Sequence, residues 1–383
     1  MVISIDSRNL NPGDIFIPVK GKYFDGHDYI NEARAKGAYV HDVDLAEFAA
    51  SQRMDYKIPV IAVTGSSGKT TTKDRIAALL ATRYKTLKTE ENFNNEIGVP
   101  LTLLRLNDSY EKNGPVRAGS KPAWSKGIST GPKPAPISIK KGSYQAAVIE
   151  MAMRGVGEIE YLTRLVRPTH VVITNIGLAH IGRLGSREMI KQAKCEILLP
   201  TEYSQIAFLN EQDEYFPEVK QLAEDNGWTV IPFDEDPLPQ IADVFGIDIS
   251  ALIAMQVNYS AKRMEIINRN GLTIINDTYN ANPNSVKWAL ERLREMPGRK
   301  IAVLGDMLEL GNNEVQYHRD IDLRGVDHVF TYGPVFNDAN ITGNSYVDKK
   351  ELIASLKSHL KEGDVVLVKG SRSMKMEDVV DDI

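Results

Sequence analysis

Residues 58–72 read Ile58-Pro-Val-Ile-Ala-Val-Thr-Gly-Ser-Ser-Gly-Lys-Thr-Thr-Thr72 and say more about the architecture of the chain than any other segment. An apolar run, a glycine-rich turn and a helical pattern predict a buried strand that leads through a turn into a helix. The inward N–H groups of such a turn, together with the helix dipole, hold phosphate oxygens. We expect a nucleoside triphosphate to contact Gly65, Ser66, Ser67, Gly68, Lys69, Thr70 and Thr71.

The residue types of this turn suit phosphate binding. Gly65 and Gly68 permit backbone geometry that a side chain would block. Lys69 supplies a point charge for the terminal phosphates, and the Thr70 hydroxyl can bind Mg²⁺. The spacing is shorter than in the general P-loop, since only Ser66 and Ser67 separate the two glycines. The turn alone leaves a motor, a GTPase switch and a small-molecule kinase open.

Further apolar runs bounded by Gly or Pro alternate with helical patterns over most of the chain, which is typical of parallel strands covered by helices on both faces. The fold class is therefore α/β. We expect strands at 58–63, 146–151, 170–174, 205–209, 300–304, 327–331 and 364–369. We expect helices at 69–83, 157–166, 187–198, 284–295 and 349–360.

Two segments depart from this alternation. Residues 1–57 contain a turn at Asn11–Asp14 with short strands on each side and a helical pattern around 28–37, which predicts a small α+β domain. Residues 108–142 are rich in Gly, Pro, Lys and Ser without apolar periodicity and predict a mobile insertion. A solvated loop is the simpler interpretation of this insertion, and a basic segment that binds an anionic partner is the alternative.

Composition narrows the functional classes. The 383 residues allow two or three domains, and 46 Lys and Arg against 51 Asp and Glu argue against nucleic-acid binding by bulk charge. The single cysteine, Cys195, excludes an intrachain disulfide or a cysteine-ligated zinc site. Charged residues interrupt the N-terminal segment, and no apolar run spans a bilayer. We expect a cytoplasmic monomer that acts on small molecules, with no membrane insertion.

Polar side chains follow the next two predicted strands. Glu150 ends the run 146–151, at the edge where parallel sheets place their ligands, and a carboxylate there suits Mg²⁺. The following strand leads to Asn175 and His180. A histidine beside an expected metal and nucleotide favours a functional role over a structural one.

At these residues the sequence resembles the Mur ligase family, the ATP-dependent enzymes that add amino acids or dipeptides to a UDP-linked cell-wall precursor. The similarity covers almost the whole chain except 108–142. Its family-wide motifs are Thr64-Gly-Ser-Ser-Gly-Lys-Thr70, Asn92–Pro100 and Thr174-Asn-Ile-Gly-Leu-Ala-His180. Motifs similar to the branch that adds D-alanyl-D-alanine to UDP-N-acetylmuramoyl-tripeptide are Asp6-Ser-Arg8, Glu150–Ile159, Asp277–Ser285, Val303–Gly311 and Lys369–Glu377.

The resemblance implies three domains and a ligase of peptidoglycan synthesis. The domains are an N-terminal one that binds the UDP moiety (1–57), a central P-loop, parallel-sheet ATPase domain (58–262) and a C-terminal Rossmann-like domain (263–383). It also implies that a substrate carboxylate attacks the γ-phosphate to form an acyl phosphate, and that an amine then displaces phosphate. Positioning and charge neutralisation are the physical tasks in such a reaction.

Residue roles also follow from the resemblance. It assigns one Mg²⁺ to Thr70 and Glu150, a second to His180, and carbamylation by CO₂ to Lys194, which then helps to hold a metal. Arg263 reaches across to the ATP phosphates, and Asp277 and Asn280 border the ribose and base. The expected catalytic residues are Lys69, Asn95, His180, Lys194 and Arg263, and the expected substrate residues are Ser7, Arg8 and Arg154.

The sequence also departs from the family. Relatives carry a His-Asn-x-x-Asn segment before the arginine matched by Arg263, and residues 210–262 contain no such segment. The helix expected after His318 is cut short by Gly325. Two alternatives follow: a divergent Mur-like amide or cyclising ligase acting on another acid, such as an archaeal wall precursor or a nickel tetrapyrrole cofactor, or a non-catalytic nucleotide-binding subunit.

Overall fold

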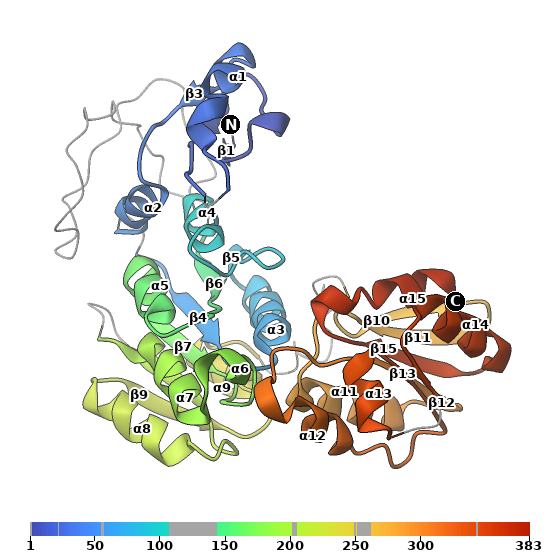
Figure 1. Ribbon diagram of the computed structural model, residues 1–383. Helices are drawn as coiled ribbons and strands as arrows, with labels where there is room; N and C mark the ends of the chain where they lie inside the picture. The colour runs from blue at the N-terminus through green and yellow to red at the C-terminus, as the bar shows by residue number, and fades with distance from the viewer. Residues whose placement is uncertain are drawn as a thin grey trace.

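Three sheets organise the chain. The computed structural model describes residues 2–21, 23–54, 57–106, 144–200, 205–248, 250, 262–341 and 344–383, so the insertion predicted at 108–142 lies outside the described residues. The sheets contain three, six and six strands and mark an N-terminal, a central and a C-terminal domain (Figure 1). The central domain contacts both of the others.

The N-terminal domain is small. Its parallel sheet has the order β1-β2-β3, with β1 (Ile3–Ser4), β2 (Ile15–Phe16) and β3 (Tyr39–Val40). The predicted helical stretch is present as a 3₁₀ turn (Gly26–Tyr29) and α1 (Ile30–Ala35). The next helix, α2 (Leu45–Met54), packs on the central domain, because its apolar side chains share a core with those of α4 (Gly98–Leu104) and α5 (Glu158–Val166).

The central domain is built on a parallel sheet of the order β5-β6-β4-β7-β8-β9. The strands are β4 (Val60–Thr64), β5 (Thr86–Lys88), β6 (Ala146–Glu150), β7 (His170–Ile173), β8 (Ile206–Asn210) and β9 (Thr229–Phe233). Besides α4 and α5, the helices are α3 (Lys69–Ala81), α6 (Ile181–Leu184), α7 (Arg187–Cys195), α8 (Phe216–Asp225) and α9 (Leu238–Val244).

The apolar run before the phosphate turn is continuous because both faces of this sheet are covered. Successive residues of a strand point to opposite faces. Val60 and Ala62 therefore pack in the core under α2, α4 and α5, while Ile61 and Val63 pack under α3 and α9. All of β4 is buried. The parallel alignment brings the carboxyl ends of β4, β6 and β7 to one edge, as predicted.

The C-terminal domain has the sheet order β10-β11-β15-β12-β13-β14. The strands are β10 (Glu265–Arg269), β11 (Leu272–Asp277), β12 (Lys300–Gly305), β13 (His328–Tyr332), β14 (Ser345–Tyr346) and β15 (Val365–Lys369). The helices are α11 (Pro283–Glu295), α12 (Glu314–Arg319), α13 (Pro334–Ala339), α14 (Lys349–His359) and α15 (Glu377–Asp382). They form apolar cores on both faces of the sheet, consistent with the Rossmann-like domain expected here.

One edge of this sheet departs from the predicted parallel pattern. β10 pairs with β11 in antiparallel register. The connecting residues Asn270 and Gly271 have φ values of +52° and +74°. Positive φ at both positions of a two-residue turn produces a tight hairpin, which Asn-Gly favours. In the described part of the chain, none of the helices combines the length and apolarity needed to cross a membrane.

Candidate active site

The turn between β4 and α3 has the geometry of a phosphate-binding loop. Gly65 and Gly68 have φ values of +147° and +79°. A Cβ on Gly65 would overlap the Oγ1 of Thr174 on the neighbouring strand end, so this position accepts only glycine. The Asn175 carbonyl and Oδ1 accept hydrogen bonds from the N–H groups of Ser66 and Ser67, at 2.9 and 3.0 Å. The end of β7 therefore fixes the turn.

The first N–H groups of α3 face no helical partner, because a helix leaves its first turn of donors unpaired. Lys69 folds back over the turn and donates from Nζ to the Gly65 carbonyl at 2.8 Å. This ammonium and the free N–H groups lie together in the same cavity. The arrangement is suited to an anion with several oxygens.

The cavity, here called the interdomain cavity, has a volume of about 840 Å³ and takes its walls from the central and C-terminal domains. The central domain contributes the 66–72 turn together with Asn94, Glu150, Asn175, His180 and Asn210. The C-terminal domain contributes Arg263, Asp277, Tyr279, Asn280, Asn282, Trp288 and Lys369. Most of the predicted nucleotide and metal residues thus meet in one place, although they come from segments about 200 positions apart.

Glu150 is a buried carboxylate of this cavity. Its Oε1 accepts a hydrogen bond from Asn94 Nδ2 at 2.8 Å, and its backbone N–H donates to Thr89 Oγ1 at 3.0 Å. Its Oε2 is buried without a hydrogen-bond partner. A buried, unpartnered carboxylate oxygen is costly unless a cation binds it. The residues therefore fit a Mg²⁺ ion held by Glu150, the Thr70 hydroxyl, phosphate oxygens and water.

No cluster of three or more His, Cys, Asp or Glu side chains suited to a metal occurs among the residues that the structure describes. A metal in the interdomain cavity would take few ligands from the protein. This is the usual situation for Mg²⁺, which is commonly bound by one or two carboxylates plus substrate phosphates.

Lys69 and His180 on the central-domain wall, and the neighbouring Lys194, all have lowered pKa values. Burial lowers the pKa of Lys69, and Arg263 lowers it further, against an opposing effect of Glu150. Lys194, on α7, is almost completely buried, and its pKa lies well below the usual value because of burial and the neighbouring Lys69 charge. Burial, followed by the Lys69 charge, also lowers the pKa of His180. Lys69 and Arg263 are the lining cations that lie near each other and could face the phosphates of a nucleotide.

Arg263 begins the C-terminal-domain wall. Its guanidinium lies 3.8 Å from the centre of the Tyr279 ring, and its Nε is buried without a hydrogen-bond partner. The flanking residues Lys262 and Met264 have φ values of +64° and +49°, a backbone conformation that side chains disfavour. A strained linker therefore carries a desolvated arginine towards Lys69.

Asp277 and Asn280 lie on the same wall, at the end of β11. Asp277 Oδ2 accepts a hydrogen bond from Lys369 Nζ at 2.5 Å, and the Asn280 carbonyl accepts another at 2.8 Å. The sequence did not single out Lys369 as a partner of Asp277. Phe233, Asn210 and Trp288 line another part of the cavity with rings and an amide, which suits a flat base.

The two domains touch at several points around the cavity. The Ser67 hydroxyl donates to Asn282 Oδ1 at 3.1 Å, and the same oxygen caps α11. The Gly182 N–H donates to the Glu309 carbonyl at 3.0 Å, and His180 Nδ1 lies 3.0 Å from Glu309 Oε2. Figure 1 shows the short helix α6 beside the loop that follows β12.

Six predicted residues are not among those that line the interdomain cavity. Two of them, Gly65 and Lys194, lie next to it, since Gly65 accepts a hydrogen bond from Lys69 and the Lys69 charge acts on Lys194. The other four lie farther away. Asn95 Oδ1 accepts hydrogen bonds from the Ile97 and Gly98 N–H groups at the start of α4. Asn95 also lines two further cavities, of about 760 and 340 Å³. Arg154 lines the smaller one and pairs with Glu96 at 2.8 Å. Ser7 is buried in the N-terminal domain, and Arg8 pairs with Asp6 on its surface.

Sequence reasoning overlooked Asn94 and Glu309 in favour of their neighbours. The Asn94-Asn95 pair offered two amides, and only packing decides that the first reaches Glu150. Glu309 belongs to the quoted motif Val303–Gly311, but no local signal indicated that it would meet His180 from another domain.

Two regions of the chain match sequence profiles. Residues 63–114 and 136–278 match the Mur ligase middle domain, and residues 262–372 match the Mur ligase glutamate ligase domain. UDP-N-acetylmuramoyl-tripeptide–D-alanyl-D-alanine ligase of Bacillus subtilis is 32% identical, with 100% of this chain and 92% of that protein covered. The Escherichia coli ligase of the same name is 29% identical, with 99% and 92% covered.

Solved structures agree with these matches. MurF of Acinetobacter baumannii has a TM-score of 0.80 and 27% identity, covering 99% of this chain and 92% of that one. MurF ligase of Thermotoga maritima in complex with ADP has a TM-score of 0.80 and 26% identity, covering 99% and 96%. The Bacillus subtilis alignment runs over 458 positions against 383 residues here, so the relative carries segments that this chain lacks.

Proposed function

The chain belongs to the Mur ligase family, and from this membership and the geometry of the interdomain cavity we propose that it is an ATP-dependent ligase that joins D-alanyl-D-alanine to UDP-N-acetylmuramoyl-tripeptide. The full-length similarity to ligases of that name supports this choice of substrates. The motifs similar to the same branch, from Asp6-Ser-Arg8 to Lys369–Glu377, lie in all three domains. We place the reaction in peptidoglycan synthesis.

The observation that carries the proposal is that Lys69, Glu150 and Arg263 line one cavity between two domains. A nucleotide in this cavity would have its phosphates on the Gly65–Thr71 turn and its base against Phe233 or Trp288. The C-terminal domain would close the other side with Arg263, Asp277 and Asn280. Enclosure from two domains excludes water from a reactive acyl phosphate.

Mg²⁺ is proposed at two positions in the cavity. Thr70 and Glu150 would hold one ion, which the unpartnered Glu150 Oε2 supports, and His180 would contribute to the second. When bound, such ions neutralise phosphate charge and orient the γ-phosphate for in-line attack. This role explains why Glu150, unlike Asp277 with its partner Lys369, is buried in the cavity without an ion pair among the described residues.

Lys194 is proposed to react with CO₂. Burial and the neighbouring Lys69 charge lower its pKa, which favours the neutral amine that reacts with CO₂, and the described residues offer it no hydrogen-bond or ion-pair partner. The neutral amine nitrogen would attack CO₂, lose one proton and become a carbamate, which places an anion beside Lys69. Protein incubated with ¹³C-bicarbonate should show a carbamate ¹³C resonance that Lys194→Ala lacks. Identical spectra from both proteins would contradict the modification.

The chain's own groups would then carry two steps. An oxygen of the tripeptide's terminal carboxylate attacks the γ-phosphorus, the bond to the β–γ bridging oxygen breaks, and ADP leaves. The dipeptide amine next attacks the acyl carbon, and phosphate leaves with the carboxylate oxygen that it gained, while the nitrogen loses a proton. Lys69 and Arg263 stabilise the charge on the transferred phosphoryl group, since both cations face it.

The acceptor is proposed to approach from the N-terminal domain. Ala152 lines both the interdomain cavity and the smaller cavity around Arg154, and Asn95 lines both that cavity and the larger one beside β1. The three cavities therefore follow one another from the N-terminal domain to the phosphates. In this arrangement Asn95 and Arg154 contact the peptide, and Ser7 and Arg8 lie at the UDP end.

The test is phosphate release from ATP with UDP-N-acetylmuramoyl-tripeptide, in the presence and absence of D-alanyl-D-alanine. Release that requires both substrates is the expected result. Release only with a different acid and amine would replace the substrates but keep the ligase chemistry. ATP binding without turnover on any acid would favour a nucleotide-binding subunit and overturn the proposed activity.

A further inference from the structure

We propose that Glu309 of the C-terminal domain is a positioning residue for His180, so that the central-domain half of the site becomes complete only when the C-terminal domain is docked. The proposal rests on the proposed function, because it gives His180 a place in that reaction. It concerns a residue that contacts neither ATP nor the reacting atoms and that acts through the imidazole.

The contact between the two side chains selects one form of the imidazole. His180 Nδ1 lies 3.0 Å from Glu309 Oε2. A carboxylate only accepts hydrogen bonds, so Nδ1 carries the proton and donates it. In the neutral ring Nε2 then keeps its lone pair, and His180 lines the interdomain cavity. A carboxylate behind the outer nitrogen is the usual device that fixes the tautomer and orientation of a ligand histidine.

The backbone holds the two side chains at this distance. The N–H group of Gly182, two residues after His180, donates to the carbonyl of Glu309 itself at 3.0 Å. A Cβ on Gly182 would lie 2.8 Å from the Gly311 nitrogen and 2.9 Å from the Glu309 oxygen. The approach of α6 to the 309–311 loop is therefore possible only because Gly182 has no side chain.

Strain at both contact residues supports a functional reading. His180 and Glu309 each have a φ of +67°, a conformation that costs on the order of 1–3 kcal/mol for residues with a side chain. The Glu309 loop is held from behind, since the Leu308 N–H donates to Ser371 Oγ at 2.8 Å and the Met307 N–H donates to His318 Nε2 at 2.9 Å. The surrounding contacts therefore hold both residues in unfavourable backbone conformations, and in these conformations the two side chains are in contact.

Stability does not account for the contact. The Glu309 side chain is 61% exposed, and an ion pair with one exposed partner contributes little to folding. Its position matters more, because the same domain also carries Arg263 into the cavity. Docking of the C-terminal domain would therefore deliver the arginine and orient the imidazole in one movement. A nucleotide bound to the undocked central domain would lack both.

The primary test is the tautomer of His180, read from the side-chain ¹⁵N shifts of ¹⁵N-histidine-labelled protein without metal or nucleotide. Spectra of His180→Gln identify the His180 signals. Wild type is expected to carry the proton on Nδ1. Glu309→Ala should shift the population towards the Nε2–H form, whereas Glu309→Gln should keep the wild-type form because its amide oxygen still accepts. This readout does not depend on the substrates, so it stands even if the proposed activity fails.

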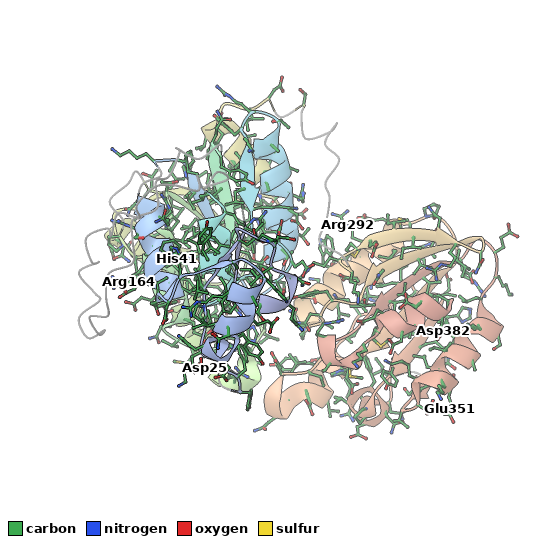
Figure 2. All side chains as sticks on the ribbon, turned by 90° about the horizontal axis from the view of Figure 1, so that it is seen from above. Asp25, His41, Arg164, Arg292, Glu351 and Asp382 are labelled. Atoms are coloured by element: carbon green, nitrogen blue, oxygen red, sulfur yellow. The ribbon has the colours of Figure 1, made fainter. Side chains whose placement is uncertain are left out.

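Gly182→Ala breaks the same contact from the other domain and leaves Glu309 in place. It should reproduce the tautomer change of Glu309→Ala, and it decides the question alone if Glu309→Ala fails to fold. Glu351→Gln is the matched control, since it removes a carboxylate from the part of the C-terminal domain remote from the central domain (Figure 2). An unchanged His180 tautomer in both Glu309→Ala and Gly182→Ala would overturn the proposal.

Two further readouts separate positioning from a structural role. With a non-hydrolysable ATP analogue present, Mn²⁺ affinity should fall about tenfold in Glu309→Ala, the range expected when a partner behind a ligand is removed. The kcat should fall about 10–100-fold while KM for the dipeptide changes less than about twofold, because the loss lies in the chemical step. A melting temperature that falls with kcat, with Mn²⁺ affinity unchanged, would contradict positioning.

Discussion

The two walls of the interdomain cavity are held in place by different kinds of contact. On the central-domain wall, one continuous segment from β4 to α3 forms the turn, and Asn175 holds it with hydrogen bonds inside the same domain. On the C-terminal-domain side, Arg263 and Asp277 line the cavity from two segments and Glu309 contacts His180 from a third, and few contacts tie this side to the other domain. The first wall is formed by folding of one domain, and the second depends on docking.

This difference indicates how binding and catalysis are divided. A preformed phosphate turn can bind the nucleotide before the domains close, because its geometry does not depend on the C-terminal domain. The second wall adds charge and excludes water at the reacting atoms, so it is expected to affect the rate more than the affinity. The following changes test this division, beginning with the largest expected effect.

Lys69→Ala changes the first wall and should cause the largest loss of ligase activity. Loss of the ammonium removes the charge nearest the transferred phosphoryl group, and kcat should fall about 10³-fold or more. ATP affinity should fall as well, because in the proposed arrangement Lys69 already contacts the nucleotide in the ground state. Phosphate release and ATP binding by calorimetry measure the two effects. Lys220→Ala, on the exposed face of α8, is the control, and a Lys69→Ala enzyme within tenfold of wild type would contradict this assignment.

Arg263→Ala changes the second wall and should lower kcat much more than it lowers ATP affinity. We expect kcat to fall about 10²–10³-fold, because the guanidinium stabilises charge that develops in the transition state. ATP affinity should change less than about threefold. Arg263→Lys keeps the charge but loses the planar stack on Tyr279, and should recover only part of the rate. A loss confined to ATP affinity would show that both walls bind the ground state.

Two glycine substitutions compare the walls in stability. Gly65→Ala places a methyl group against Thr174 inside one domain and imposes a φ of +147° on alanine, so unfolding free energy should fall by about 2–3 kcal/mol. Gly182→Ala disturbs a contact between domains, and should change the unfolding free energy by less than about 0.5 kcal/mol. Urea denaturation followed by circular dichroism measures both. Equal losses of unfolding free energy would mean that the contact between the domains stabilises the fold as much as packing inside the central domain does.

A small, pH-dependent effect is expected at Glu377, which pairs with Lys262 at the start of the C-terminal domain. Burial would raise the pKa of Glu377, but hydrogen bonds from Lys262 and Arg372 outweigh it and lower this pKa from 4.5 to about 2. A depressed carboxyl pKa stabilises the fold above the unfolded value and loses this effect as pH falls through the folded value.

Glu377→Gln should therefore be less stable than wild type at pH 6, by less than about 1 kcal/mol, since both partners are partly exposed. The difference in urea midpoint should shrink as pH falls below 4.5 towards 2, where wild type also loses the charge. Glu351→Gln serves as the control, with no such trend. A difference that grows towards acid pH would contradict the assigned sign.

Residue patterns alone predicted most of the first wall, whereas Arg263, Asp277 and Asn280 of the second wall were expected only through the family resemblance. Every strand and helix predicted from its apolar run is present, because a run such as 58–63 reports burial on both faces of one sheet. The antiparallel strand β10 was missed although Asn270-Gly271 signals a hairpin. The contact of Glu309 with His180 joins two residues that are 129 positions apart in the sequence and belong to different domains. Periodicity and local motifs describe neighbouring residues, so they do not predict such a contact.

The central claim is that the acceptor carboxylate is activated by phosphoryl transfer in the interdomain cavity, and oxygen labelling tests it most directly. The enzyme would receive UDP-N-acetylmuramoyl-tripeptide labelled with ¹⁸O in the terminal carboxylate, with ATP and D-alanyl-D-alanine, and the released phosphate would be analysed by mass spectrometry. Transfer through an acyl phosphate predicts one ¹⁸O atom in each phosphate formed from fully labelled acceptor. Phosphate that carries no label would contradict the account.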